Sequence, residues 1–242
     1  MIMSRKIKII IFIILFFLIV GSVYLYLQFQ LNGHYSTDGK SIYYSLVENG
    51  EGKIIENADL KSFEVLNNYY SKDKNHVYHE GKIMKEADSK TFATTKSDYY
   101  AKDKNHVYRS GGIIKDSNVE SFEVLDLNYA KDKNHVYKGS KIIRGADPGS
   151  FKLSNTNYAV DKNYVYEFGK IIEGADPSSF EAMKLQYTKD KNHVYKYGKI
   201  VEGVDVDSFE VIDIRYSKDK NHVYREEKIV EGVDPKTFIS DF

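Results

Sequence analysis

The sequence has no cysteine and no tryptophan, and only three prolines among its 242 residues. Without cysteine, the chain cannot form a disulfide, a thiolate metal site, a cysteine nucleophile or a lipid-modified cysteine. It also has no excess charge of either sign, because lysine plus arginine and aspartate plus glutamate both number 35. Nucleic-acid-binding proteins depend on a cationic surface, so we expect no nucleic-acid partner.

What the chain does contain is a short motif that returns at a regular interval. Residues 132–137 read Asp-Lys-Asn-His-Val-Tyr. An interval of about 30 residues predicts a repeat protein in which each unit packs against its neighbours. The 21 tyrosines and 13 phenylalanines favour strands over helices. Copies of the motif begin at Asp73, Asp103, Asp132, Asp161, Asp190 and Asp219, and a degenerate copy begins at Asp38.

The N-terminal segment differs in composition from the repeats. Residues 1–8 are basic and precede an uncharged, apolar run at residues 9–27. A helix of that length spans about 29 Å, close to the hydrocarbon thickness of a bilayer. The positive-inside rule places residues 1–8 in the cytoplasm. We therefore expect a single-pass signal-anchor helix at 9–27 in the cytoplasmic (inner) membrane, a linker at 28–34, and an extracytoplasmic repeat domain at 35–242, in the periplasm or at the cell surface.

A cleaved signal peptide is the competing interpretation of the same segment. Gly21 and Ser22 are small residues near the end of the apolar run, as a cleavage site requires. The run is longer than the typical apolar region of about 7–15 residues, and no Ala-x-Ala sequence follows it. These two features favour an uncleaved anchor. Both interpretations export the repeats.

Each repeat predicts a strand led by phenylalanine and then a hairpin. After Phe209 the apolar residues alternate with one slip, which predicts a strand with a bulge or a bend. The Asp-Lys-Asn sequence at 219–221 predicts the hairpin turn, with the asparagine in the left-handed conformation that closes a three-residue loop. A further strand is expected at 199–201. Residues 174–180 predict a capped turn or a single helical turn.

The two ends of the array are atypical. The first copy lacks the Phe-led strand and carries a six-residue insertion between Tyr43 and Lys53, and residues 238–242 form a Phe-led strand without a hairpin. We expect an all-β repeat array of hairpin units, arranged as an open solenoid. A seven-bladed β-propeller is the alternative, because the last strand could complete the first unit. Against it, about 29 residues is short for the four strands of a blade.

The motif resembles that of a known family. Residues 129–137 read Tyr-Ala-Lys-Asp-Lys-Asn-His-Val-Tyr, followed by Gly-Ala-Asp-Pro at 145–148, and this pattern is similar to the DKNYY family of bacterial repeat proteins over residues 35–242. The chain departs from the family name, because His-Val-Tyr follows Asp-Lys-Asn in five copies and Tyr-Val-Tyr follows it at 164–166. The resemblance implies a repeat protein of the cell envelope and no particular activity.

Two sets of polar residues in the motif could hold a metal ion. Aligned imidazoles bind metals or respond to pH near 6.5, and aspartate oxygens in a turn suit Ca²⁺. Packing beside the turn is the stronger explanation for the histidines, since Tyr164 replaces one of them, and turn formation better explains the aspartates. We therefore expect no metal site and keep only weak candidates: His76, His106, His135, His193 and His222.

The tyrosine that ends the motif could form a ladder that stacks on sugar rings or holds a peptide. Cross-strand packing of aromatic residues explains the same ladder without a ligand. The residues of this possible ligand surface are Tyr137, Tyr166, Tyr195 and Tyr224.

The distribution of polar residues argues against an enzyme. All conspicuous polar residues belong to the repeat, whereas a catalytic site needs an asymmetric set of residues. We expect no cofactor and a non-enzymatic binding or scaffolding module for a protein or glycan of the cell envelope. The alternatives are a metal-dependent factor or enzyme that uses the repeated histidines, and a purely structural spacer.

Overall fold

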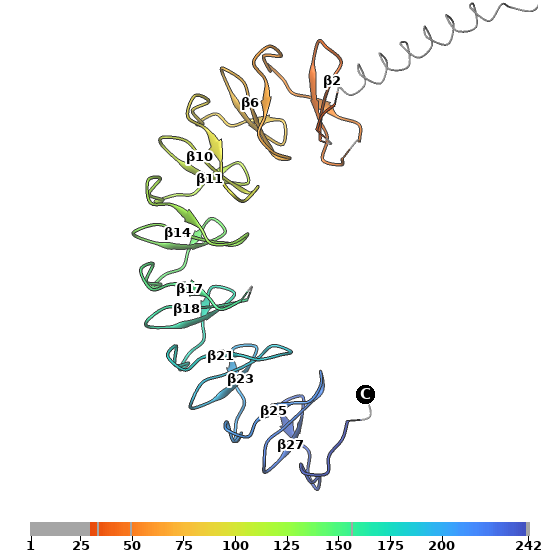
Figure 1. Ribbon diagram of the computed structural model, residues 1–242, viewed down its shortest axis with the longest axis vertical. Coiled ribbons are helices and arrows are strands. Elements are labelled where there is room, and N and C mark those ends of the chain that lie inside the picture. Colours follow the sequence, from red (N-terminus) through yellow and green to blue (C-terminus); the bar gives the residue numbers. More distant parts are fainter. Residues whose placement is uncertain (1–29, 33, 49, 156, 241–242) are drawn as a thin grey trace, which may run out of the picture. The chain divides into compact units, whose positions relative to one another are not determined.

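The computed structural model describes residues 30–32, 34–48, 50–155 and 157–240, and every regular element within them is a β-strand. The strands form seven antiparallel sheets of four strands each, in chain order within every sheet (Figure 1). The chain divides into two units, Met1–Glu120 and Ser121–Phe242. The predicted membrane helix at 9–27 lies outside the described residues, which themselves include no helix long and apolar enough to cross a membrane.

The first unit contains three of the sheets. Its strands, sheet by sheet, are β1 (Gln30–Asn32), β2 (Tyr35–Thr37), β3 (Ile42–Tyr44) and β4 (Lys53–Ile54); β5 (Glu64–Val65), β6 (Tyr70–Lys72), β7 (Val77–His79) and β8 (Lys82–Ile83); and β9 (Ala93–Thr94), β10 (Tyr100–Lys102), β11 (Val107–Arg109) and β12 (Gly112–Ile113).

The second unit contains the other four sheets. Its strands are β13 (Glu123–Val124), β14 (Tyr129–Lys131), β15 (Val136–Lys138) and β16 (Lys141–Ile142); β17 (Lys152–Leu153), β18 (Tyr158–Val160), β19 (Val165–Glu167) and β20 (Lys170–Ile171); β21 (Glu181–Ala182), β22 (Tyr187–Lys189), β23 (Val194–Lys196) and β24 (Lys199–Ile200); and β25 (Glu210–Val211), β26 (Tyr216–Lys218), β27 (Val223–Arg225) and β28 (Lys228–Ile229).

Short strands explain how a repeat of about 29 residues holds a whole sheet. Apart from β1, each sheet has edge strands of two residues and central strands of three. The expectation that a repeat of this length is too short for four strands is therefore wrong. The all-β repeat architecture is confirmed, and none of the described sheets closes into a barrel.

The ends of the array also differ from expectation. The first sheet is complete, because β1 pairs with β2 in the place of the missing Phe-led strand. At the other end, residues 238–240 form no strand, and Phe238 instead packs its ring 5.1 Å from that of Tyr216. Residues 241–242 of the predicted last strand lie outside the described part of the chain.

The central hairpin of each sheet forms where the motif predicts it. In the second sheet, Lys72 on β6 pairs with Val77 on β7, so residues 73–76 make the turn. The predicted left-handed asparagine is wrong, because Asn75 and its counterparts in the other copies have no positive φ. The side chain of Asp73 closes the turn instead, by accepting hydrogen bonds from the N–H groups of Asn75 and His76.

Only two residues of each Phe-led segment join a sheet. After β25, the Asp213 carboxylate accepts hydrogen bonds from the N–H groups of Arg215 and Tyr216, at 2.7 and 2.9 Å, and turns the chain into β26. Ile214 lies in this turn and is 75% exposed. The slip in the apolar alternation is therefore a bend between two strands.

The turn that follows the last strand of each sheet is capped but is not a helix. Around Pro148, the N–H and the hydroxyl of Ser150 both donate to Asp147 Oδ1 at 2.9 Å. The N–H of Phe151 donates to the Asp147 carbonyl at 2.9 Å. These bonds aim Phe151 into the core that follows.

The core lies between consecutive sheets of the same unit. The ring of Phe92 lies 5.6 Å from the rings of Tyr70 and Tyr108, which belong to neighbouring sheets. Phe151 contacts Tyr129 and Tyr166 in the same way, at 6.0 and 5.6 Å. Each tilted aromatic pair contributes about 0.5–1.5 kcal/mol beyond its buried area. Side-chain packing thus joins the sheets, since the described strands of different sheets do not pair.

Candidate functional site

The aspartate that begins the motif is buried at the corner of each hairpin. Asp190 is 2% exposed. Its Oδ1 accepts hydrogen bonds from the N–H groups of Asn192 and His193, at 2.7 and 2.8 Å. Its Oδ2 accepts from the N–H of Asp176 and the hydroxyl of Tyr195, both at 2.8 Å. Four such charge-assisted bonds fasten the turn to the segment before it.

The same four bonds recur in other copies. In each, Oδ1 closes the turn, and Oδ2 holds the preceding capped turn and the tyrosine that ends the motif. The aspartates with this complete set are Asp73, Asp103, Asp161 and Asp219.

The corner carboxylate is ionised despite its burial. Burial is the largest single influence on the pKa of Asp190 and raises it, but the four hydrogen bonds together lower the pKa below its ordinary value of 3.8. The Nζ of Lys191 lies 2.7 Å from Asp176 Oδ2, and this contact is the main cause of the lowered pKa of Asp176. The carboxylates of Asp190 and Asp176 thus both make contacts that stabilise the fold.

The five candidate histidines pack against the tyrosine two residues further on. The ring centroids lie 6.0–6.1 Å apart in edge-on contacts. Tyr164 takes the same place against Tyr166 at 6.3 Å, so a ring without an imidazole nitrogen fills the position equally well. No three His, Cys, Asp or Glu side chains come together as metal ligands within the described residues. The histidines are His76, His106, His135, His193 and His222.

The four tyrosines of the possible ligand surface are core residues. Tyr137, Tyr166, Tyr195 and Tyr224 are all 0% exposed. Each donates its hydroxyl to the corner carboxylate at 2.7–2.8 Å. The structure contradicts a ligand surface on these rings, because burial leaves no ring face open to a sugar or a peptide.

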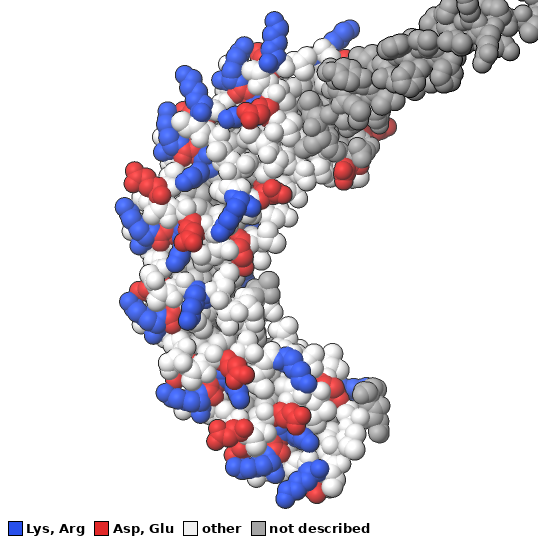
Figure 2. All heavy atoms as spheres, in the orientation of Figure 1, with Lys and Arg blue, Asp and Glu red and all other residues white. Residues whose placement is uncertain are grey.

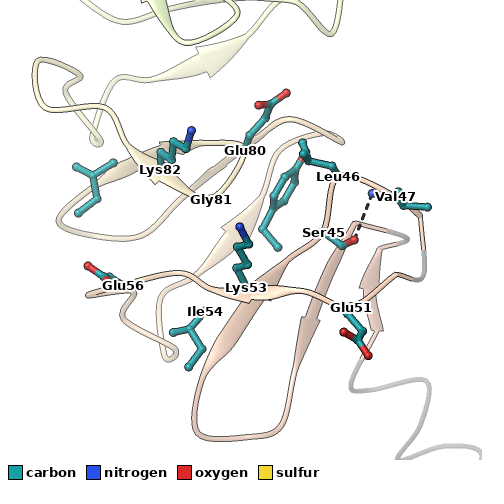
Figure 3. A pocket seen from close by; sticks show the side chains of 12 residues that line it. Ser45, Leu46, Val47, Glu51, Lys53, Ile54, Glu56, Glu80, Gly81 and Lys82 are labelled. Carbon is teal, nitrogen blue, oxygen red and sulfur yellow. Dashed lines mark hydrogen bonds between the residues drawn. The ribbon is translucent and has the colours of Figure 1, made fainter.

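A groove in the first unit interrupts the repeated pattern. It lies between the stretch Tyr44–Glu56 and the turn that joins β7 to β8, and Figure 3 shows both walls. Its volume of about 670 Å³ falls in the range of ligand pockets. The insertion of the first copy provides one end of the groove, and Glu56 lies at the other (Figure 3). No other described copy has this insertion.

Exposed apolar side chains line this groove. Leu46 and Val47 are 72% and 69% exposed, and Ile54 is 58% exposed. The Val47 N–H donates to Ser45 Oγ at 3.2 Å, which fixes the bend of the insertion. The opposite wall carries Gly81 at φ +73°, where a Cβ would lie only 2.9 Å from that of Tyr44. Only glycine lets the two walls approach this closely.

Charges of both signs border the groove. Glu51, Lys53, Glu56 and Lys82 line it, and Lys53 extends from β4 toward the wall that carries Lys82 (Figure 3). Acidic and basic side chains are also interspersed over the face shown in Figure 2. The local field is therefore weak, and the apolar side chains dominate what this groove can recognise.

Comparison with known proteins identifies the repeat. A model of the DKNYY family matches residues 35–167, 158–202 and 187–241. The chain belongs to the DKNYY family. The resemblance carried by the motif is thereby confirmed. No curated protein and no solved structure matches the chain.

The DKNYY motif accounts for the corner of each repeat but not for the groove. Leu46, Val47 and Ile54 lie outside the motif, and the sequence-based expectations did not include them. For Leu46 and Val47, the signal that could have found them is the insertion between Tyr43 and Lys53, which places apolar residues where the other copies have a tight turn. Ile54 instead occupies the Lys-Ile position that recurs in most other copies.

Proposed function

We propose that this DKNYY-family chain is a membrane-anchored, exported binding protein without enzymatic activity. The apolar run at 9–27 and the basic residues before it support an anchor with the N-terminus in the cytoplasm and the repeats outside. The polar residues of the motif support a non-enzymatic role, because the corner carboxylates are occupied by four hydrogen bonds each.

The finer architecture belongs to the same proposal. The sheets stack as an open solenoid, in which each repeat contacts only its neighbours through the Tyr–Phe–Tyr packing. The packing of Phe92 between Tyr70 and Tyr108 of consecutive sheets supports stacking within a unit. Solenoids offer extended surfaces on which a scaffold can hold a partner.

The groove of the first unit favours a protein partner. The observation that carries the proposal is the set of three exposed apolar side chains, Leu46, Val47 and Ile54, around one concave surface. Grouped exposed apolar residues mark interaction sites, whereas isolated ones are common on protein surfaces. A partner segment with apolar side chains would cover them, and the bordering charges would fix its orientation.

Comparative capture from native envelopes tests this function. The full-length chain and the Leu46→Ser/Val47→Ser variant are solubilised in the same detergent and used as bait. Ile214→Ser is the matched control, because Ile214 is equally exposed but lies in the second unit, outside the groove. A protein bound by the wild type and the control but lost by the groove variant supports the proposal. Identical capture by all three baits would place binding outside the groove and refute this assignment, and no capture by any bait favours a structural spacer.

A further inference from the structure

A second groove, in the second unit, combines cationic side chains with an exposed aromatic ring. It lies between the segment 138–144 and the turn that precedes β20, and its volume is about 400 Å³. Lys138, Lys141 and Arg144 line it together with Phe168, against a single carboxylate from Glu173. The groove therefore has a positive field and one flat apolar face.

Phe168 adopts a backbone conformation that a bulky residue rarely accepts. It is the first residue of the turn between β19 and β20, with φ +49°, and its side chain is 50% exposed. A positive φ, between +47° and +63°, recurs at the equivalent turn residues of the other copies, so the geometry of the turn sets it and only the side chain varies between copies. The half-exposed ring adds little to the core. The equivalent turn residues elsewhere are Glu80, Ser110, Gly139, Tyr197 and Glu226.

Lys138 is held directly beside this ring. Its Nζ donates to the Phe168 carbonyl at 2.6 Å and lies 4.9 Å from the centre of the Phe168 ring. Burial lowers the pKa of Lys138, the charge of Lys170 lowers it further, and Asp126 opposes both. An anion that entered the groove would offset the repulsion between these two cations.

The next copy of the repeat provides an internal comparison. There, Glu167 and Glu173 occupy the positions of Lys138 and Arg144, and Tyr197 occupies that of Phe168. Tyr197 also has positive φ, at +50°, and is 63% exposed. Both copies thus have an exposed aromatic ring with a lysine over it, since Lys196 Nζ lies 5.4 Å from the centre of the Tyr197 ring. They differ in that Lys138 and Arg144 are replaced by two glutamates in the next copy.

We propose that the Phe168 groove binds an anionic saccharide. The sugar ring stacks on the face of Phe168, while a carboxylate or phosphate on the saccharide binds Lys138, Lys141 and Arg144. A saccharide fits better than an acidic peptide, because a flat aromatic face beside the cations is suited to a sugar ring. This assignment rests on the proposed function as a binding module and names a ligand class for a second site.

Binding measurements on the full-length chain in detergent micelles test the assignment. The probes for isothermal titration calorimetry are polygalacturonate, phosphorylated dextran, unmodified dextran and polyglutamate. Wild type is expected to bind at least one of the two anionic polysaccharides at least about tenfold more tightly than unmodified dextran and polyglutamate. Its affinity should fall as NaCl rises, because salt screens exposed charges. Binding of polygalacturonate would identify the anionic group as a carboxylate, and binding of phosphorylated dextran would identify it as a phosphate.

Three variants test the cationic and aromatic parts of the groove separately. Arg144→Glu installs the residue found in the next copy, and Phe168→Asn introduces a residue that tolerates positive φ, so both should fold. Each should weaken binding at least about tenfold, with an unfolding transition within about 5 °C of wild type. Tyr197→Asn, in the acidic neighbouring groove, should leave binding unchanged.

The remaining outcomes overturn the assignment. If unmodified dextran bound as tightly as the anionic polysaccharides, charge would have no role in recognition. If polyglutamate bound as tightly as they do, the groove would be a peptide site. Loss of binding in Tyr197→Asn, or no binding to any probe, would also refute it. None of these results alters the capture test on the first-unit groove, because the two grooves share no residue.

Discussion

The corner carboxylate gives the most direct test of what holds each repeat together. Asp190→Asn keeps the size of the side chain but replaces one acceptor oxygen with a donor. Whichever way the amide turns, two of the four hydrogen bonds to the carboxylate are lost: those from the N–H groups of Asn192 and His193, or those from the Asp176 N–H and the Tyr195 hydroxyl. A bond to a charged group contributes about 1.5–3 kcal/mol, so the variant should lose about 3–6 kcal/mol of stability.

Thermal and urea denaturation of the purified full-length chain measure this loss. For a chain of this size each kcal/mol lowers Tm by about 2–4 °C, which predicts a decrease of about 6–24 °C. Lys191→Gln is the matched control, because it removes only the ion pair with Asp176, and exposed ion pairs contribute little to stability. Tyr195→Phe loses a single bond to Asp190 and should fall between the two. A Tm for Asp190→Asn no lower than that of Lys191→Gln would refute a stabilising role for the corner carboxylate.

Three further predictions concern the pH range, the core and the metal alternative. Asp59, Asp88 and Asp147 have pKa values lowered to about 2, chiefly by their lysine partners, so their stabilisation is present above the unfolded pKa of about 3.9 and is lost as pH falls toward 2. Burial also lowers the pKa of His79, so some stability is lost as pH falls below the unfolded histidine pKa of about 6.5. Tm measured against pH should therefore decline below about 6.5 and fall further below about 4, and a flat profile down to pH 2 would contradict this. Phe151→Ala should cost about 3–5 kcal/mol in urea denaturation, because Phe151 is 3% exposed between two tyrosine rings, whereas Ile214→Ala should cost less than about 0.5 kcal/mol. A chelator should leave both Tm and the amount of bound metal unchanged. If the protein instead bound metal and lost it when the repeated histidines were replaced with asparagine, the metal-dependent alternative would be supported.

The period of the sequence was enough to predict the class of fold and the position of each hairpin. The motif locates each turn, because it begins with Asp190 or an equivalent aspartate. A buried turn carboxylate needs the same hydrogen-bond partners in every copy, so the sequence around it recurs. The four strands of a unit could be expected from the sequence, but their boundaries could not be read in this way. Strands of two residues, such as Glu210–Val211, are too short for an alternation of apolar and polar residues to identify them.

The candidate sites were harder to predict because exposure depends on tertiary packing. The tyrosines that end the motif looked suited to a ligand, but the neighbouring sheet covers them and leaves them 0% exposed. Leu46 and Phe168 carry no motif, and their significance comes from the concave surfaces beside them. The insertion in the first copy was visible in the sequence, but the groove beside it forms only when β7 and β8 of the next sheet approach.

The two grooves share a property that separates them from the repeated residues. A repeat duplicates whatever stabilises its unit, so a residue present in nearly every copy, such as Asp190, is explained by the core alone. Leu46 and Val47 lie in an insertion of one copy, and Arg144 with Phe168 departs from the copy that follows. These departures are exposed. Stability does not account for them, so ligand binding in this repeat protein is best sought where a copy differs from its neighbours.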